Sequence, residues 1–232
     1  DARRLLNTLE TLAVSAAAQK VAEITDAWLL KVLGERMRRY DKGGEQFYDT
    51  ISALHKSVRG SDPDAALYWF VRMLDGGADP RYMARRMIRM ASEDIGLADN
   101  SMLTLATSAA QTVALIGFPE ARITLAQVTI ALALAPKSNS AYVAIDRAID
   151  DIRQGHIGDV PPHLRDSHYS RAGDLGHGVG YIYPHDTTHG VADQTYLPDA
   201  IAQRRYYEPT NHGEESALAT LWAKLRGLLG RQ

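Results

Sequence analysis

Residues 45–155 carry a succession of amphipathic helix patterns joined by connections of only about 2 to 6 residues, a spacing typical of helical bundles. Two of these patterns begin with the same pair of residues, Asp62-Pro63 and Asp79-Pro80. The aspartate is placed to cap the helix and the proline fits its first turn. Connections this short force each helix to pack on its neighbours in sequence, so the chain is predicted to fold as an all-α protein.

The apolar residues of these segments recur every three or four positions, as one buried helix face requires. The residues predicted to face the core are Phe47, Ile51 and Leu54 in the first helix, Ala66, Phe70 and Leu74 in the second, and Met83, Met87, Met90 and Ala91 in the third. Further helices are expected near residues 100–116, 119–135, 140–155 and 214–229.

The N-terminal segment is also helical in period, and one face of it is predicted to be a buried stripe. That stripe consists of Leu5, Leu9, Leu12 and Ala16. A short helix capped by Thr25 or Asp26 is expected to follow and to end at Gly34. The next segment, residues 36–44, has no apolar pattern and is predicted to be an exposed connection, the best domain boundary in this part of the chain.

Residues 156–213 differ from the rest, because they show no sustained period and hold seven of the eight histidines. Glycine, proline and tyrosine are frequent there. One alternative is a disordered segment. The tyrosines and the apolar stretch 181–183 ("YIY") favour a long irregular arm laid over the helices and held by its aromatic residues, before a final amphipathic helix.

Composition excludes several classes of protein. The 232 residues contain no cysteine, which removes disulfides, thiolate metal sites and a cysteine nucleophile. The longest apolar stretches are far shorter than the roughly 20 residues of a membrane-spanning helix. Because the chain starts at Asp1, inside a helical pattern and without a leader, we expect it to be a piece of a longer protein.

Catalytic motifs are weak in this sequence. There is no GxxxxGK[ST], so the chain alone is not expected to hydrolyse ATP, and "GHGVG" carries no lysine and precedes no helix. A metal site is disfavoured because His185 and His189 lie between a proline and a glycine rather than on one helix face. Paired carboxylates at Glu93 and Asp94 are expected to pair with nearby arginines, and Arg165 is expected to pair with Asp166 or across an interface.

Charge is unevenly distributed, although the net charge is only −2. Residues 31–90 hold twelve lysines and arginines against eight acidic residues, a local balance of +4. A basic face able to meet nucleic-acid phosphates would consist of Lys56, Arg59, Arg81, Arg85, Arg86 and Arg89. The alternative is a solvated helix face, and the few aromatic residues among these positions give little support for base stacking.

Seven stretches, in this order, resemble the C-terminal part of the replication-associated recombination ATPases. They are "DARRLLNTLE", "YDKGGEQFYDTISALHKSVRGSDPDAALYWFVRML", "ARRMIRMASEDIGLAD", "APKSN", "VPPHLRD", "YPHD" and "YLPD". This family comprises the bacterial maintenance-of-genome-stability AAA+ proteins and their eukaryotic relative, the Werner-helicase-interacting protein. One departure is Phe47, where the family pattern leads us to expect histidine.

The resemblance implies specific roles for parts of the chain. Residues 1–36 would be the remainder of an AAA+ lid, whose sensor-2 Arg3 would reach ATP in the full-length protein. Residues 37–155 would be similar to the collar of sliding-clamp loaders, and residues 156–232 would form the arm and last helix packed on the same domain.

The resemblance also implies what the whole protein does. It implies a homotetramer, action on DNA ends, gaps or stalled forks, contact with single-strand-binding protein, ATP and Mg²⁺ in the full-length protein, and a nucleoid-associated place in the bacterial cytoplasm.

Three hypotheses for function follow. The first is a non-catalytic oligomerisation domain of a DNA-dependent AAA+ ATPase. The second is a DNA-binding module that uses the basic helix face. The third is a helical metalloprotein that uses the histidine-rich arm.

Overall fold

The computed structural model describes residues 2–32 and 45–230 of the chain. The described residues form helices and irregular segments without a strand, which confirms the all-α prediction. The chain divides into two compact units. The first contains the residues up to Arg86 together with 109–133, and the second contains residues 87–108 together with those from Leu134 onward.

The N-terminal helices are α1 (Ala2–Ala18) and α2 (Asp26–Val32). Thr25 caps α2, since its hydroxyl accepts from the backbone N–H of Trp28 at 3.3 Å. Leu12 is buried, but Leu5 and Leu9 are 63% and 54% exposed, so the prediction of one buried stripe is wrong for these two leucines. The reason is length, because the seven residues of α2 rise only about 10 Å against about 25 Å for the 17 residues of α1. The proposed boundary at 36–44 and the stop at Gly34 lie outside the described residues.

Three helices follow, α3 (Glu45–Arg59), α4 (Pro63–Asp75) and α5 (Pro80–Met90). The carboxylate of Asp62 accepts from the N–H of Ala65 at 2.9 Å, and the carboxylate of Asp79 accepts from the N–H of Arg81 at 2.8 Å. The repeated Asp-Pro pair therefore starts both α4 and α5, as the sequence predicts.

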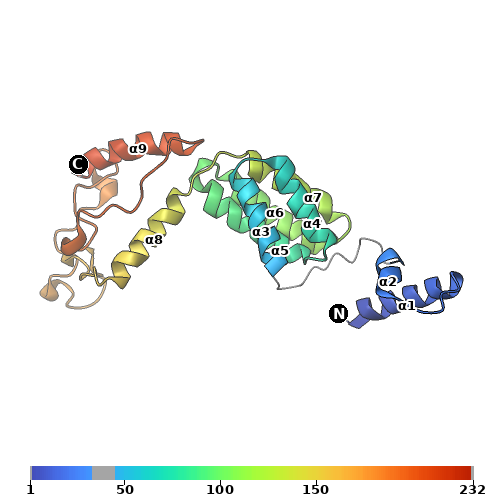
Figure 1. Ribbon diagram of the computed structural model, residues 1–232. Coiled ribbons are helices and arrows are strands. Elements are labelled where there is room, and N and C mark those ends of the chain that lie inside the picture. The colour runs from blue at the N-terminus through green and yellow to red at the C-terminus, as the bar shows by residue number, and fades with distance from the viewer. Residues whose placement is uncertain (1, 33–44, 231–232) are drawn as a thin grey trace. The chain divides into compact units, whose positions relative to one another are not determined.

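Figure 1 shows α3, α4 and α5 gathered with α7 (Ala121–Leu134) in one helical bundle. Their buried faces follow the predicted spacing at Ile51, Leu54, Ala66, Phe70, Met83, Met87, Met90 and Ala91. The prediction is wrong at Leu74, which is only half-buried, because Met73 faces the core in its place. Phe47 is half-buried and its ring lies 5.3 Å from that of Tyr82, centroid to centroid.

After α5 the helix widens into a π-helical turn (Ala91–Ile95) and then tightens into a 3₁₀ turn (Gly96–Ala98). The longer helices that follow are α6 (Ser101–Ile116), α7, α8 (Ser140–Arg153) and, at the end of the chain, α9 (Glu215–Leu228). All four lie within two residues of their predicted positions at each end. In the described residues no helix is both long and apolar enough to cross a bilayer.

The arm between α8 and α9 is irregular, as predicted, and contains only short 3₁₀ turns. These are Pro162–Leu164, Gly173–Leu175, Pro184–Asp186 and Asp199–Ile201. Figure 1 shows the arm, yellow to orange, running from the end of α8 to the start of α9.

The prediction that Tyr181, Ile182 and Tyr183 hold the arm is wrong, because all three side chains are exposed. The Gln194 side-chain amide pairs with both backbone groups of Ile182, at 3.1 and 2.9 Å, so this stretch folds against the arm itself. The tyrosines that anchor the arm lie nearer its end, at Tyr206 and Tyr207, whose hydroxyls bond to Asp151 and Glu215.

Candidate functional site

Three sequence motifs that lie far apart in the chain meet at one junction in the second unit. They are residues 91–98 ("ASEDIGLA"), 135–140 ("APKSNS") and 210–215 ("TNHGEE"). The backbone N–H of Ser138 donates to the carbonyl of Asp94 at 2.9 Å, and the N–H of Glu214 donates to the carbonyl of Ala98 at 2.8 Å. We call this the motif junction.

The centre of the motif junction is the fully buried carboxylate of Glu215. One oxygen accepts from Thr210 at 2.6 Å and from Ser138, and the other accepts from Tyr207 at 3.0 Å and from Ser140. Burial alone would raise the pKa of Glu215, but these four hydroxyl donors, led by Ser138 and Ser140, hold it below its usual value. Burial and the bond to Glu215 raise the pKa of Tyr207 to about 12. The carboxylate is therefore charged, satisfied from within the chain and suited to fixing α9 and the arm in place.

Two glycines allow the motifs of the junction to approach so closely. Gly213 has a φ of +50°, and a Cβ there would lie 2.2 Å from the carbonyl oxygen of Ala98 and 2.6 Å from the ring of Pro136. Gly96 also has a φ of +50°, and its Cβ would lie 2.8 Å from the carbonyl oxygen of Ser138. A side chain at either position would push the backbones apart.

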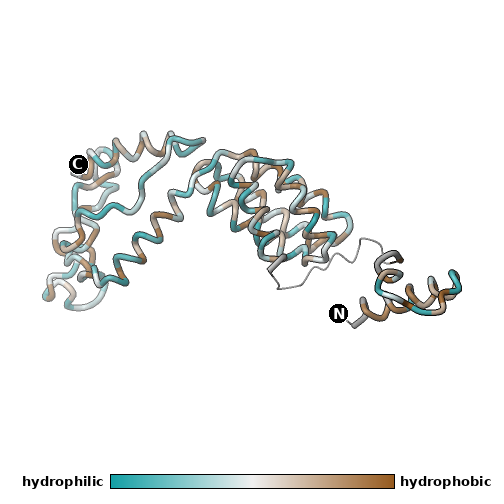
Figure 2. Tube along the Cα trace, viewed as in Figure 1, coloured by the Kyte–Doolittle hydropathy of each residue, from teal (hydrophilic) through white to brown (hydrophobic). Residues whose placement is uncertain are grey.

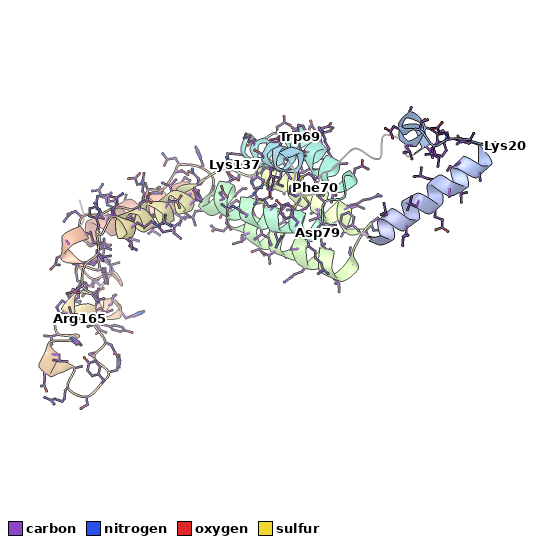
Figure 3. All side chains as sticks on the ribbon, turned by 60° about the horizontal axis from the view of Figure 1, so that its bottom comes forward. Lys20, Trp69, Phe70, Asp79, Lys137 and Arg165 are labelled. Atoms are coloured by element: carbon purple, nitrogen blue, oxygen red, sulfur yellow. The ribbon has the colours of Figure 1, made fainter. Side chains whose placement is uncertain are left out.

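The paired carboxylates predicted at the end of α5 have separate environments. Glu93 accepts from Arg89 at 2.6 Å, as predicted for one of them. Asp94 is buried beside Lys137, labelled in Figure 3. Burial lowers the pKa of Lys137, and the negative charge of Asp94 offsets part of that shift.

The six residues of the predicted basic face differ in their surroundings. Lys56 and Arg59 end α3 and are exposed, and Arg81 and Arg85 are exposed along α5. The other two are engaged, because Arg86 donates to the His55 ring at 3.1 Å and Arg89 is paired with Glu93. The guanidinium of Arg85 also lies 5.7 Å from the centre of the Tyr82 ring.

Two imidazoles of the histidine-rich arm bond to other residues of the arm. His163 bonds to the carbonyl of Thr195 at 2.8 Å, and His177 bonds to the hydroxyl of Tyr169 at 2.5 Å. Among the described residues, no group of three or more histidines and carboxylates is arranged to hold a metal ion.

The expected pairing of Arg165 with Asp166 is wrong. Arg165, labelled in Figure 3, donates to the carbonyl of Val160 at 2.8 Å. Asp166 instead bonds to the ring and backbone N–H of His168, at 2.8 and 3.0 Å, and these bonds hold its pKa below the usual value. The two side chains are adjacent in sequence but leave an extended backbone in different directions, which a pattern of residue types does not show.

A feature that the sequence reasoning missed is an exposed apolar row along α8. The row consists of Tyr142, Ile145, Ile149 and Ile152, spaced by three, four and three residues, and Ile145 and Ile152 are 59% and 61% exposed. Figure 2 shows apolar and hydrophilic residues alternating turn by turn along this helix. The spacing of three, four and three residues is visible in the sequence and could have predicted this apolar row.

The opposite, polar side of α8 is covered by the chain's own arm. Asp151 accepts from the Tyr206 hydroxyl at 3.0 Å and pairs with Arg204 at 3.2 Å. Arg147 pairs with Glu208 at 2.9 Å. The helix thus packs its hydrophilic side against its own chain and presents its apolar row outward.

The predicted nucleotide-contacting residue, Arg3, lies in the first turn of α1. Its side chain is outside the part of the chain that the structure describes.

Comparison with known proteins gives matches over the whole chain. Residues 60–226 match the family model described as MgsA AAA+ ATPase C terminal, and residues 1–59 match the model described as AAA C-terminal domain. The chain is 49% identical over its full length to an AAA domain-containing protein of Mycobacterium tuberculosis, covering 51% of that protein.

Two further relatives carry functional names. The replication-associated recombination protein A of Bacillus subtilis is 45% identical over 97% of this chain and 54% of its own length. The ATPase WRNIP1 of Dictyostelium discoideum is 45% identical over 77% of this chain and 21% of its own length. The chain spans about half the length of the bacterial relatives it matches.

Proposed function

The chain belongs to the MgsA family of AAA+ ATPases, as its C-terminal part, and from that premise we propose that it holds copies of a DNA-dependent ATPase together as a homotetramer. The chain itself has no catalytic role in this proposal. Within it, residues 1–36 act as the remainder of the AAA+ lid, residues 37–155 as the collar-like oligomerisation domain, and residues 156–232 as an arm and helix that complete the same domain.

The apolar row of α8 is the observation that carries the proposal. Full burial of a large aliphatic or aromatic side chain is worth about 1.5 to 3 kcal/mol, and the four partly exposed side chains of this row forgo part of that contribution. The arm covers the hydrophilic side of α8, where burial of side chains contributes less free energy than burial of the apolar row would. We therefore expect the apolar row to pack against another molecule.

A second copy of the chain is the partner that we favour, because the row is self-complementary. The spacing of three, four and three residues reads the same in both directions along the helix. In an antiparallel pair related by a two-fold axis, Tyr142 would face Ile152 of the other copy and Ile145 would face Ile149. Such isologous contacts are the commonest way in which identical chains associate.

The first unit exposes a separate apolar cluster around the turn between α6 and α7. It consists of Leu115, Ile116, Phe118 and Ile123, of which Leu115 and Ile123 are 86% and 71% exposed. Two distinct apolar surfaces on one chain support an assembly larger than a dimer, because each copy can contact two neighbours.

The proposed assembly would serve the full-length enzyme by fixing the spacing of its ATPase domains. In AAA+ proteins a neighbouring subunit completes the nucleotide site, so a tether raises the effective concentration of that neighbour. Arg3 would act as the sensor-2 residue toward ATP and Mg²⁺ bound by the full-length protein. DNA ends, gaps or forks, single-strand-binding protein and a nucleoid-associated cytoplasmic location belong to the same proposal.

The second candidate function is DNA binding by the basic face. The exposed side chains of Lys56, Arg59, Arg81 and Arg85 favour it, while the engagement of Arg86 and Arg89 with His55 and Glu93 counts against it.

Light scattering on the chain tests the first proposal against the second. The first predicts a mass close to four times 25.5 kDa at micromolar concentration. It also predicts that reversing two charges, Arg81→Glu with Arg85→Glu, leaves this mass unchanged. A persistent monomer would contradict it, and a tetramer that loses all DNA affinity through the reversal would show that the second function operates on the same domain.

A further inference from the structure

A small apolar pocket in the second unit lies between α9 and the 3₁₀ turn at Gly96–Ala98. Its volume is about 230 Å³, below the range of about 300 to 1,000 Å³ seen for small-ligand sites. It is lined by Leu97, Tyr207, Leu218, Leu221, Trp222 and Leu225. We call it the leucine pocket, and its size suits one or two protein side chains rather than a small molecule.

The lining of the leucine pocket offers little to a polar ligand. The hydroxyl of Tyr207 is engaged, because it donates to the buried carboxylate of Glu215 at 3.0 Å. The indole N–H of Trp222 is the other side-chain hydrogen-bonding group of the lining. Leu221 is 50% exposed, so part of this apolar surface meets water. An apolar side chain suits the pocket, whereas a charged one would lose its hydration without gaining a partner.

The apolar cluster at the turn between α6 and α7 has the complementary, projecting form. We call this cluster the α6–α7 tip; it consists of Leu115, Ile116, Phe118 and Ile123. Leu115 is 86% exposed, more than any other large apolar side chain that the structure describes. The N–H of Gly117 donates to the carbonyl of Val113 at 3.1 Å, and the N–H of Ala121 donates to the carbonyl of Gly117 at 2.9 Å. Because these bonds fix the turn, docking of the tip loses little conformational entropy.

The length of α6 decides which copy of the chain can fill the pocket. Leu97, in the pocket, precedes α6 by four residues, and Leu115 lies in the last turn of this helix. The 16 residues of α6 rise about 24 Å, so one copy does not insert its own tip into its own pocket. A second copy that runs in the opposite direction can accept the tip of the first and offer its own tip in return.

Charges beside the two surfaces are also complementary. Glu120 is exposed and follows Phe118 of the tip by two residues. Lys224 is exposed on α9 three residues after Leu221, on the same side of the helix as the mouth of the pocket. Arg122, also exposed, lies two positions beyond Glu120 and therefore does not share its side of the chain. Docking of the tip would bring Glu120 toward Lys224.

We propose that the α6–α7 tip of one copy inserts Leu115 into the leucine pocket of a second copy, and that the second copy inserts its own Leu115 into the pocket of the first. This inference rests on the proposed tetramer and names the surfaces of its second interface. Reciprocal contacts of this kind are related by a two-fold axis. Together with the two-fold pairing of the α8 rows, they close a tetramer of D₂ symmetry.

Disulfide cross-linking tests the contact directly, because the chain contains no cysteine of its own. Three variants are oxidised with diamide: Leu115→Cys, Leu221→Cys, and the combination of both. Covalent dimers on a non-reducing gel are expected only from the combination, since the tip of one copy then meets the pocket of the other. The matched control combines Leu115→Cys with Leu175→Cys, because Leu175 is 65% exposed but lies outside both surfaces. It is expected to stay monomeric on the gel.

Light scattering supplies a second readout. Leu115→Asp is expected to halve the mass of the tetramer, leaving pairs held by the α8 rows, whereas Leu175→Asp should keep the full mass. Glu120→Lys and Lys224→Glu should each raise the dissociation constant of the dimer-to-tetramer step by about fivefold. The two reversals combined should restore it to within about twofold, because the charges are then exchanged.

Either of two cross-linking results would overturn the proposal. Covalent dimers from Leu115→Cys alone would mean that the tip packs on another tip, and no dimers from the combination would mean that the tip does not reach the pocket. The test is separable from that of the assembly itself. A tetramer whose mass is unchanged by Leu115→Asp would contradict this contact alone, whereas a monomeric unmodified chain would contradict the proposed function as well.

Discussion

The motif junction and the apolar row of α8 lie in the same unit, yet they are opposite in one respect. At the junction, each oxygen of the buried Glu215 carboxylate accepts two hydroxyl bonds from its own chain. Along α8, four large apolar side chains remain 36% to 61% exposed in the described part of the chain. The first region is complete within one copy and therefore stabilises the fold. The second is incomplete, and its function lies in what covers it.

The largest effect is expected from a side chain at the tightest point of the junction. Gly213→Ala should lower the free energy of unfolding by more than about 3 kcal/mol, because the new Cβ would meet backbone at 2.2 Å as well as adopt a positive φ. Gly117→Ala is the matched control. Gly117 has a φ of +69° but no atom within 4 Å of its Cβ, so the cost should be only about 1 kcal/mol. Urea unfolding of both variants measures the difference, and equal losses would show that close packing at the junction contributes nothing.

Removal of the central carboxylate is expected to have the next largest effect. Glu215→Ala leaves four hydroxyls without their charged acceptor and should cost about 3 kcal/mol. The neighbouring Glu214→Ala removes an exposed carboxylate that accepts only 3.3 Å bonds from Asn100, and should cost less than about 1 kcal/mol. Similar unfolding midpoints for the two variants would contradict the assignment of Glu215 as the anchor.

The junction should also give the fold an acid-sensitive part of its stability. The pKa of Glu215 is lower in the folded chain than in the unfolded one, so its contribution is fully present above the unfolded pKa, about 4.3. It is lost as the pH falls through the lower, folded pKa. The difference in unfolding free energy between the unmodified chain and Glu215→Gln should therefore shrink as the pH falls below about 4.3. A difference that grows on acidification would reverse the sign and contradict the argument.

The smallest effect is expected where a charge pair is exposed rather than buried. Arg89→Gln breaks the pair with Glu93, but more than half of the Arg89 side chain is in solvent. The free energy of unfolding should change by less than about 1 kcal/mol, and less still at high salt. A loss as large as that of Glu215→Ala would contradict the expectation that an exposed ion pair contributes little to the free energy of unfolding.

The helices could be predicted from sequence because their signals are local. Asp62 and Asp79 cap the helices that they precede, and the methionines of α5 are buried at the predicted spacing. The motif junction could not be predicted, because Ser138 and Glu215 are separated by 77 positions and no local pattern brings them together. Burial of Leu5 and Leu9 was predicted wrongly, since periodicity shows which face is apolar but not what covers it.

The arm shows the same limit in another form. Aromatic content correctly predicts that tyrosines hold the arm, but it does not distinguish Tyr181 and Tyr183, which are exposed, from Tyr206 and Tyr207. What distinguishes them is a carboxylate within reach of each hydroxyl, Asp151 for one and Glu215 for the other. Only the folded chain supplies those partners.

The central claim is that the uncovered row of α8 holds copies of the chain together. The most direct test is light scattering of Ile145→Asp with Ile149→Asp against the control Gln154→Glu, which adds one charge at the far side of the end of the same helix. The account predicts that the double variant falls to half the mass of the unmodified chain or less, with unchanged helix content, while the control keeps the full mass. An unchanged mass in the double variant would contradict it.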